Sequence, residues 1–499
     1  MFQKDKGLEI SDRSIYGRAS KGAFWVFLLR VIQLLLQTIK LMILAHLLDP
    51  YNFGLMGVAL LTMAVLETFS TTGFEAALIQ KKEDIRSYLD IAWTALVLRG
   101  SILFALLYLV SPYAAMFFNE PKAAPIIQVV GISVIFKALA NIGVVYFQKE
   151  MEFHKTFVYT LSGSLADISV AIPAALLLKS VWALVLGSLA SALVRLVVSY
   201  IIHPYRPHLS FNKQQFKELF AFGKWLLGST VVVFLARQGD DAFLGKVLGA
   251  SALGLYQMAY RFADLPGSEV GVLSRVAFPA YSKLQGNIAK LRKAYLKMVG
   301  CLSLLSIPLA GGIFALCPEF TQIFLGNKWM PMVPALRILI MSEMIKVPMD
   351  TCGALFNGVG RPDMSFRLVF VRVITLAVII YPLTMRWEIS GTALAVLLAI
   401  CASVPIWLLG TAKLIKIDPA DYLRMFWPPL VGTAGMCLVL FGLGKFIDQF
   451  QLAGFLCSVL AAAVSFLCFM FLIQELADYS VLREIKSLFD SLRLRGDSS

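Results

Sequence analysis

The chain has 499 residues, of which 59% are hydrophobic and 15% charged, and its mean hydropathy is +0.76. This composition excludes a soluble globular protein, and the many apolar runs near 20 residues indicate an all-α polytopic membrane protein. The formal net charge is +14, but the basic residues lie between apolar runs rather than on a soluble surface, so we expect no nucleic-acid partner. The seven cysteines lack CxxC spacing and the four histidines lack ligand spacing, so no metal site is expected.

The N-terminal segment, residues 1–22, is polar and carries five basic residues. The apolar run that follows is too long for the core of a cleaved signal peptide, so a retained cytoplasmic segment is predicted. From there the sequence predicts fourteen membrane-spanning helices, at 23–47, 54–78, 91–113, 126–147, 157–178, 182–202, 226–245, 252–280, 298–317, 335–357, 368–385, 390–411, 427–444 and 452–474.

The distribution of lysine and arginine predicts the orientation of these spans. With the N-terminus inside, the cytoplasmic segments hold 28 basic residues and the opposite loops hold 6. Because basic residues favour cytoplasmic loops, both termini are expected in the cytoplasm. In the tail, residues 475–499, an apolar stripe lies among four basic residues, Arg483, Lys486, Arg493 and Arg495, and predicts an interfacial amphipathic helix.

A shift of 200 residues aligns the first two spans with the seventh and eighth: Trp25 with Trp225, Leu44 with Leu244 and Gly54 with Gly254. Two related six-helix lobes around a central cavity are therefore expected. The predicted organisation is an N-lobe at 23–202, a cytoplasmic linker at 203–225, a C-lobe at 226–411, two extra helices at 412–474 and the tail at 475–499.

Charged residues inside the spans are the candidate functional groups, because an intramembrane charge is costly and normally faces a partner or a water-filled cavity. The first span carries a polar stripe that includes Arg30 and Lys40, with no acid on the same helix, and the second span carries Glu67. Spans three to six carry Arg99, Lys137, Asp167 and Arg195 singly, each either reaching the membrane surface or facing a cavity.

The densest charge lies between residues 237 and 264. Arg237, Asp240 and Asp241 share one helical face, and Arg261 and Asp264 share another. Gly239 and Pro266 lie beside these charges, where a helix can break and line a cavity. The charges predict either a transport site or interhelical ion pairs that only hold the bundle together.

Seven segments in order resemble a known family: GRASKGAFWVFLLRVIQ, VYFQKEMEFHK, VWALVLGSLASALVR, RQGDDAFLGKVLGASALGLYQMAYRFADLP, RVAFPAYSKLQ, LGNKWMPMVPALRIL and NGVGRPD. Together they resemble the polysaccharide-transporter branch of the multidrug/oligosaccharidyl-lipid/polysaccharide superfamily, closest to Wzx-type flippases of the colanic-acid-exporter kind. The resemblance implies a multi-pass protein of the bacterial inner membrane that moves an undecaprenyl-pyrophosphate-linked oligosaccharide across the bilayer by alternating access. It makes polysaccharide polymerase and chain-length machinery candidate partners, besides the membrane lipids.

A pyrophosphate group is a compact multiple anion, so carrying it through hydrocarbon requires fixed cations. We expect Arg30, Lys40, Arg237 and Arg261 to contact it. Asp240, Asp241, Asp264 and Glu67 are expected to orient those cations or to take up a coupling proton or sodium ion, with no other cofactor.

Two other functions compete with the flippase. A multidrug-type, ion-coupled antiporter would share the lobes, but twelve spans and an acid-dominated site in the first lobe would be expected. A membrane polymerase or glycosyltransferase would be an enzyme, and it would show a large extracytoplasmic loop or an acidic metal motif, which this sequence does not show.

Overall fold

The computed structural model describes residues 12–70, 74, 78, 85–150, 152–210, 212–267 and 270–477, and over these residues the regular secondary structure is helical. The all-α prediction is therefore confirmed. In chain order the elements are α1 (Asp12–Leu47), α2 (Pro50–Phe69), α4 (Arg86–Phe117), α5 (Ala123–Leu139), η1 (Ile142–Val144), α6 (Val145–Lys149), α7 (Phe153–Leu178), α8 (Trp182–Ile202), α9 (Lys213–Ala263), η2 (Leu265–Gly267), α10 (Val270–Leu284), α11 (Ile288–Phe320), η3 (Thr321–Leu325), η4 (Asn327–Met332), α12 (Val333–Gly358), α13 (Pro362–Ile415), α14 (Pro419–Leu443) and α15 (Leu452–Ala477).

Over the described residues most of each expected span is helical, although the span at 252–280 is interrupted by η2. Nine helices of the described residues are long and apolar enough to cross a membrane. Two pairs of spans join into long helices with a break inside. In α9 the break is at Gly249, and in α13 it is at Trp387 and Glu388, both where the sequence predicts a loop. The protein is thus a multi-pass membrane protein.

One expected span is bent, and one expected break is wrong. The span at 126–147 divides into α5 and a short segment from Ile142, which meet at an angle of 69°. Pro266 lies in the turn η2, where α9 has ended, as predicted. Gly239, in contrast, lies within continuous helix, because the backbone of α9 departs from helical geometry at Gly249 instead.

Several helices begin where a side chain accepts from a free backbone N–H of the first turn, or where a proline removes one such N–H. Asp418 and Asp421 form a reciprocal capping box at the start of α14, where Pro419 follows the cap. The Asn287 side chain accepts from the Lys290 backbone N–H and starts α11. These polar caps place the starts of α11 and α14 at the borders of apolar segments.

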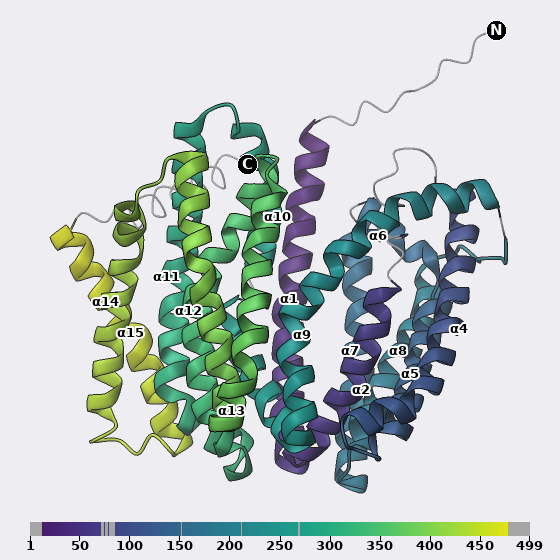
Figure 1. Cartoon of the computed structure of the whole chain (residues 1–499), viewed down its shortest axis with the longest axis horizontal. Helices are drawn as coiled ribbons and strands as arrows, with labels where there is room; N and C mark the ends of the chain where they lie inside the picture. The colour runs from purple at the N-terminus through teal and green to yellow at the C-terminus, as the bar shows by residue number, and fades with distance from the viewer. Residues whose placement is uncertain are drawn as a thin grey trace. The chain divides into compact units, whose positions relative to one another are not determined.

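The chain divides into two compact units (Figure 1). The first comprises Met1–Phe234 and Gly245–Ser251, and the second comprises Leu235–Leu244 and Ala252–Ser499. In the first unit α7 packs along α8, α4 along α5, and α1 along α7. In the second, α12 packs along α13, and α11 packs against α12 and α14. The lobe and linker boundaries given above stay a prediction.

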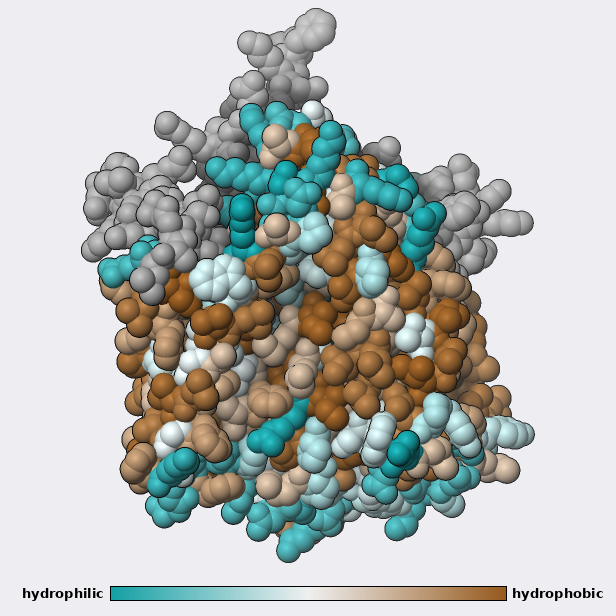
Figure 2. Space-filling model, turned by 60° about the vertical axis from the view of Figure 1, so that its left-hand side comes forward, coloured by the Kyte–Doolittle hydropathy of each residue, from teal (hydrophilic) through white to brown (hydrophobic). Residues whose placement is uncertain are grey.

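Apolar side chains also cover helix faces that point outward. Leu438 and Phe441 on α14 and Leu460 and Leu467 on α15 are all exposed. On the face drawn in Figure 2, brown apolar residues form a band, with hydrophilic residues above and below it. Such a band between polar ends is what the hydrocarbon core of a bilayer requires.

Candidate functional site

Two acids on α9, Asp240 and Asp241, accept hydrogen bonds from neutral donors. The Tyr256 hydroxyl donates to Asp240 Oδ2 at 2.7 Å, and Gln257 Nε2 donates to Asp241 Oδ2 at 2.9 Å. These contacts form because α9 breaks at Gly249, whose φ of 82° and ψ of −178° reverse the chain at a cost that only glycine avoids. Asp240 is only 4% exposed, and burial in apolar surroundings is unfavourable for a carboxylate. The hydrogen bond from Tyr256 offsets part of this cost.

Arg237 is not the partner of these acids. Its side chain is exposed, and among the described residues no carboxylate lies within ion-pair distance of it. The shared helical face of Arg237, Asp240 and Asp241 therefore does not produce an ion pair. The reason is geometric, because Tyr256 and Gln257 approach the two acids from the second leg of α9.

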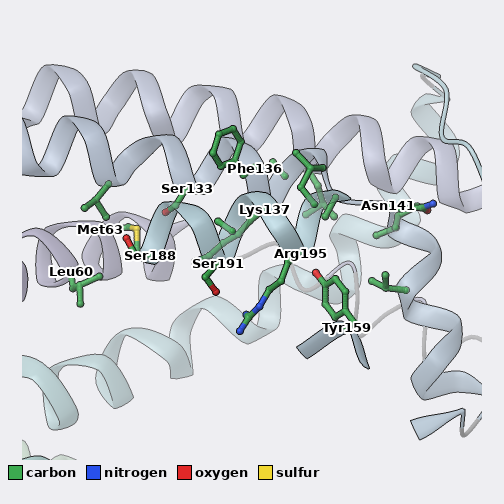
Figure 3. A pocket seen from close by; sticks show the side chains of 18 residues that line it. Leu60, Met63, Ser133, Phe136, Lys137, Asn141, Tyr159, Ser188, Ser191 and Arg195 are labelled. Atoms are coloured by element: carbon green, nitrogen blue, oxygen red, sulfur yellow. The ribbon is translucent and has the colours of Figure 1, made fainter. Parts of the chain in front are cut away.

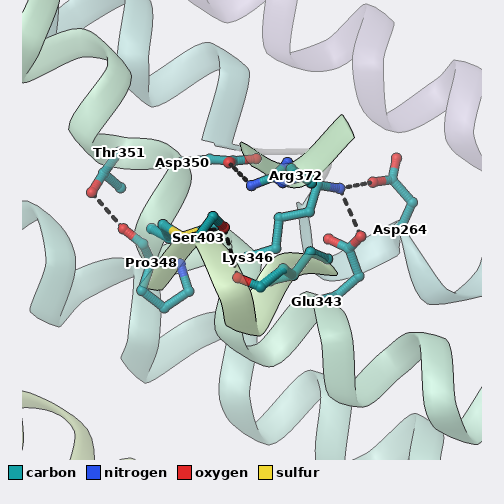
Figure 4. Close-up of polar contacts among 10 residues, drawn as sticks. Asp264, Glu343, Lys346, Pro348, Asp350, Thr351, Arg372 and Ser403 are labelled. Atoms are coloured by element: carbon teal, nitrogen blue, oxygen red, sulfur yellow. Dashed lines mark hydrogen bonds and ion pairs between the residues drawn. The ribbon is translucent and has the colours of Figure 1, made fainter. Parts of the chain in front are cut away.

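A lysine on α12 pairs with two acids of the second unit. Lys346 Nζ lies 2.7 Å from Glu343 Oε1, one turn earlier on the same helix, and 3.6 Å from Asp264 Oδ1 (Figure 4). The Glu343 side chain is 3% exposed, and its second oxygen, Oε2, accepts no hydrogen bond. Asp264 is thus paired with Lys346 rather than with Arg261, the partner suggested by the spacing along α9.

A second ion pair lies one turn further along α12. Arg372 Nη2 of α13 lies 3.5 Å from Asp350 Oδ1, and Figure 4 shows both residues beside Lys346. Glu343, Lys346 and Asp350 are not among the residues predicted from the sequence. Their spacing of i, i+3 and i+7 within an apolar run is the same signal that identified Arg30 and Lys40.

The first unit pairs Lys40 with an acid on another helix. Lys40 Nζ lies 2.6 Å from both Oδ1 and Oδ2 of Asp167, which joins α1 to α7. The carboxylate fits closely against α8, where a Cβ on Gly187 would lie 2.5 Å from Asp167 Oδ1. Neither Lys40 nor Asp167 has a partner of opposite charge within its own predicted span, and in the structure the two residues form an ion pair with one another.

Glu67 and Lys137 form a looser pair between α2 and α5, with Lys137 Nζ 3.5 Å from Glu67 Oε1. Beside them, Arg99 donates from Nη2 to the Glu67 carbonyl at 3.2 Å and to Ser70 Oγ at 3.1 Å. Arg99 therefore caps the C-terminal end of α2, where unpaired carbonyls attract a cation. Its role is to end a helix rather than to line a cavity.

A cavity of about 370 Å³ lies within the first unit, where α5 ends and bends. Figure 3 shows Arg195 of α8 and Lys137 of α5 among the residues that line it, together with Ser133, Ser188 and Ser191. Its remaining wall is largely apolar and includes Leu60, Met63, Phe136 and Leu196. The broken backbone near Asn141 is accommodated because it borders this cavity rather than lipid.

Hydrogen bonds join the start of the predicted linker to helices of the first unit. The Asn141 side chain donates to the Tyr205 carbonyl at 2.6 Å, and the Tyr205 hydroxyl donates to Asp90 Oδ1 at 2.6 Å. Burial, helped by the nearby charge of Lys155, lowers the pKa of His203, whose Nδ1 accepts the Tyr205 N–H. Burial and the bond to Asp90 raise the pKa of Tyr205.

The remaining predicted residues stay predictions. Arg30 on α1 and Arg261 on α9 have exposed side chains. The predicted amphipathic helix in the C-terminal tail lies outside the described residues. Among the described histidines, cysteines, aspartates and glutamates, no group of three or more is arranged to hold a metal ion.

The helices define the class of protein, a multi-pass α-helical membrane protein. The fold is that of a lipid II flippase, MurJ in an inward closed conformation, with a TM-score of 0.71 at 16% identity over 91% of this chain and 98% of that one. An inward-facing multidrug resistance transporter of the MATE family in the MOP superfamily gives a TM-score of 0.62 at 15% identity, over 77% and 94% of the two chains.

Residues 43–334 match the family described as polysaccharide biosynthesis protein, and the chain belongs to this family. It is 26% identical to the lipopolysaccharide biosynthesis protein WzxC of Escherichia coli (strain K12), over 86% of this chain and 88% of the relative. It is 24% identical to the teichuronic acid biosynthesis protein TuaB of Bacillus subtilis (strain 168), over 81% and 84%. The resemblance to polysaccharide transporters of the superfamily is confirmed.

Proposed function

We propose that the protein is a flippase that moves undecaprenyl-pyrophosphate-linked oligosaccharide units across the bacterial inner membrane for the synthesis of a surface polysaccharide. The observation that carries the proposal is the family membership, with relatives named for lipopolysaccharide and teichuronic acid biosynthesis along most of their length. The protein acts by transport, not as an enzyme. Both termini lie in the cytoplasm, in agreement with the distribution of basic residues.

The charges of the helices support an anionic cargo. Arg30 on α1 and Arg237 and Arg261 on α9 are exposed, and a guanidinium binds two phosphate oxygens at once. We assign contact with the pyrophosphate to Arg237 and Arg261 of the second unit, and Arg30 of the first unit stays a candidate from the sequence. Lys40 has a different task, since its ammonium group is already held by both oxygens of Asp167 and fastens α1 to α7.

Asp240 and Asp241 of the second unit bind the ion whose movement drives transport. Asp240 and Asp241 are held by neutral donors, so each is able to take up a proton or a cation without breaking an ion pair. Glu343 has one oxygen that accepts no hydrogen bond. We assign the coupling proton or sodium ion to Asp240 and Asp241, and we assign to Lys346 the role of holding Glu343 and Asp264 in place.

Deletion of the gene in its native host tests the function. Loss of one surface polysaccharide, with its lipid-linked repeat units retained in the inner leaflet, is the expected result. Normal polymer output with altered drug tolerance would overturn the proposal and favour an antiporter. A fusion reporter at Asn327 should lie outside the cytoplasm, and a reporter at Gly286 should lie inside it.

A further inference from the structure

The cavity between α2, α5, α7 and α8 is lined by a cation that forms no ion pair with the described carboxylates. Arg195 lines this cavity, and its Nε atom is buried without a hydrogen-bond partner. Arg195 as a whole is only partly buried, so the feature that calls for a ligand is this buried Nε–H donor, which a bound acceptor would satisfy.

The packing around Arg195 holds the side chain in place. A Cβ on Gly163 of α7 would lie 2.2 Å from Arg195 Nε and 2.7 Å from its Cγ, so the arginine lies across a glycine that has no side chain to displace it. The nearest acid on that helix, Asp167, is one turn further on and is taken by Lys40. The helix therefore accommodates Arg195 without neutralising it.

The cavity also offers the other groups that an oxyanion needs. Lys137 adds a second cation, which Glu67 neutralises only in part from 3.5 Å. Ser133, Ser188 and Ser191 supply hydroxyl groups. A volume of about 370 Å³ is at the lower end of the range for small-molecule sites, and the remainder of the wall is largely apolar.

We propose that this cavity is a binding site for a phosphate group, held by Arg195 and Lys137 and by the serine hydroxyls. The phosphate is either inorganic phosphate or the headgroup of an anionic phospholipid that enters between the helices. The site lies wholly within the first unit and does not depend on the proposed transport of a lipid-linked oligosaccharide. Its ligand is an oxyanion because guanidinium, ammonium and hydroxyl groups all donate to oxygen.

Binding is tested with the full-length protein in two preparations. In detergent, calorimetric titration with inorganic phosphate, at constant ionic strength, measures the free-phosphate source. In nanodiscs, the fluorescence of a labelled phosphatidylglycerol, titrated against phosphatidylcholine, measures the lipid source. Saturable binding in either preparation supports the site and identifies the source. Absence of saturable binding in both overturns the proposal, whatever the outcome of the gene deletion.

Variants then place the ligand in the cavity. Arg195→Gln should weaken binding about tenfold or more, because a charge-assisted hydrogen bond is lost, and Lys137→Gln should weaken it less. Gly163→Ala keeps every charge but displaces Arg195, so it should also weaken binding. Lys179→Gln, at an exposed position of the same unit, is the matched control and should bind as the unsubstituted protein does.

A purely structural Arg195 gives a different pattern. Arg195→Gln would then lower the melting temperature while the remaining folded protein bound phosphate with unchanged affinity, and that result would reject the site. If Arg195→Gln fails to fold, the phosphate affinities of Arg195→Lys and Gly163→Ala are measured instead. Unchanged affinity in both of these variants rejects the site, and weakened affinity in folded Gly163→Ala protein supports it.

Discussion

Lys40 Nζ of α1 lies 2.6 Å from both carboxylate oxygens of Asp167 on α7, a residue 127 positions further along the chain. Their side chains are 18% and 25% exposed, so the ion pair is partly shielded from solvent. Lys40→Ala leaves Asp167 without its cation and should destabilise the protein by about 2 kcal/mol, between the values for surface and fully buried pairs. The measurement is the amount of folded protein in the membrane and its melting temperature.

The double variant separates pairing from cargo binding. Lys40→Ala with Asp167→Ala leaves no unpaired charge, so the amount of folded protein should recover. Export should recover with it, because Lys40 fastens two helices rather than contacting the pyrophosphate. Normal abundance with export still absent in the double variant would return Lys40 to the set of cargo-binding residues.

Two glycines of α9 should respond in opposite directions. Gly249 has a φ of 82° and a ψ of −178°, so Gly249→Ala should cost about 1–3 kcal/mol through backbone strain. Gly239 lies in regular helix with nothing within 4 Å of an added Cβ, so Gly239→Ala should stabilise by about 0.5–1 kcal/mol. Melting temperatures of the two purified variants test this. Equal shifts would show that the chain does not reverse at Gly249.

His203 should make stability depend on pH. Its pKa lies below the ordinary value of 6.5, mainly because of burial and secondarily because of Lys155. Below pH 6.5 the unfolded chain therefore binds more protons than the folded one. The stabilisation is complete above pH 6.5 and is lost as the pH falls toward the lowered pKa. The bond that Nδ1 accepts from the Tyr205 N–H is broken by protonation.

Thermal unfolding between about pH 7.5 and about pH 5.5 measures this effect. His203→Gln cannot titrate, so its melting temperature should fall less than that of the unsubstituted protein over this range. His208→Gln, in the same segment with an exposed side chain, is the control and should keep the full pH dependence. A slope unchanged by His203→Gln would assign the dependence to other groups.

The sequence predicts the helices well because each span leaves a direct trace in composition. Runs of about 20 apolar residues mark the helices, and the loops predicted near residues 249 and 388 are present as breaks inside α9 and α13. The bend after Leu139 has no comparable signal. It depends on Asn141, whose side chain caps Gly143 and bonds to Tyr205, a residue 64 positions away.

The partners of the charges could not be predicted in the same way. Helical periodicity places residues on a face of their own helix, and it does not say which helix that face meets. Asp240 and Arg237 share a face, yet Asp240 bonds to Tyr256 across the break in α9. Likewise, Lys40 finds its acid on α7 and Asp264 finds its cation on α12. Such pairings depend on tertiary packing.

Arg237 and Arg261 provide the decisive test of the transport site. Because Asp240 and Asp241 are held by Tyr256 and Gln257, Arg237→Ala deprives neither acid of its donor and should leave the protein level normal. If the two arginines contact pyrophosphate, Arg237→Ala and Arg261→Ala should each lower export at least tenfold, since a charged hydrogen-bond donor is lost. Replacing either arginine by lysine should restore export only in part, because lysine keeps the charge but lacks the planar guanidinium that binds two oxygens at once.

Export normalised to the amount of membrane protein is the quantity to measure. Lys346→Ala is the matched control, because it removes the cation next to Glu343 and Asp264 and should lower the amount of folded protein itself. Arg237→Ala combined with Asp240→Asn distinguishes the two roles. Continued loss of export at normal abundance supports contact with the cargo, whereas recovery of export would show that Arg237 only balanced the charge of Asp240.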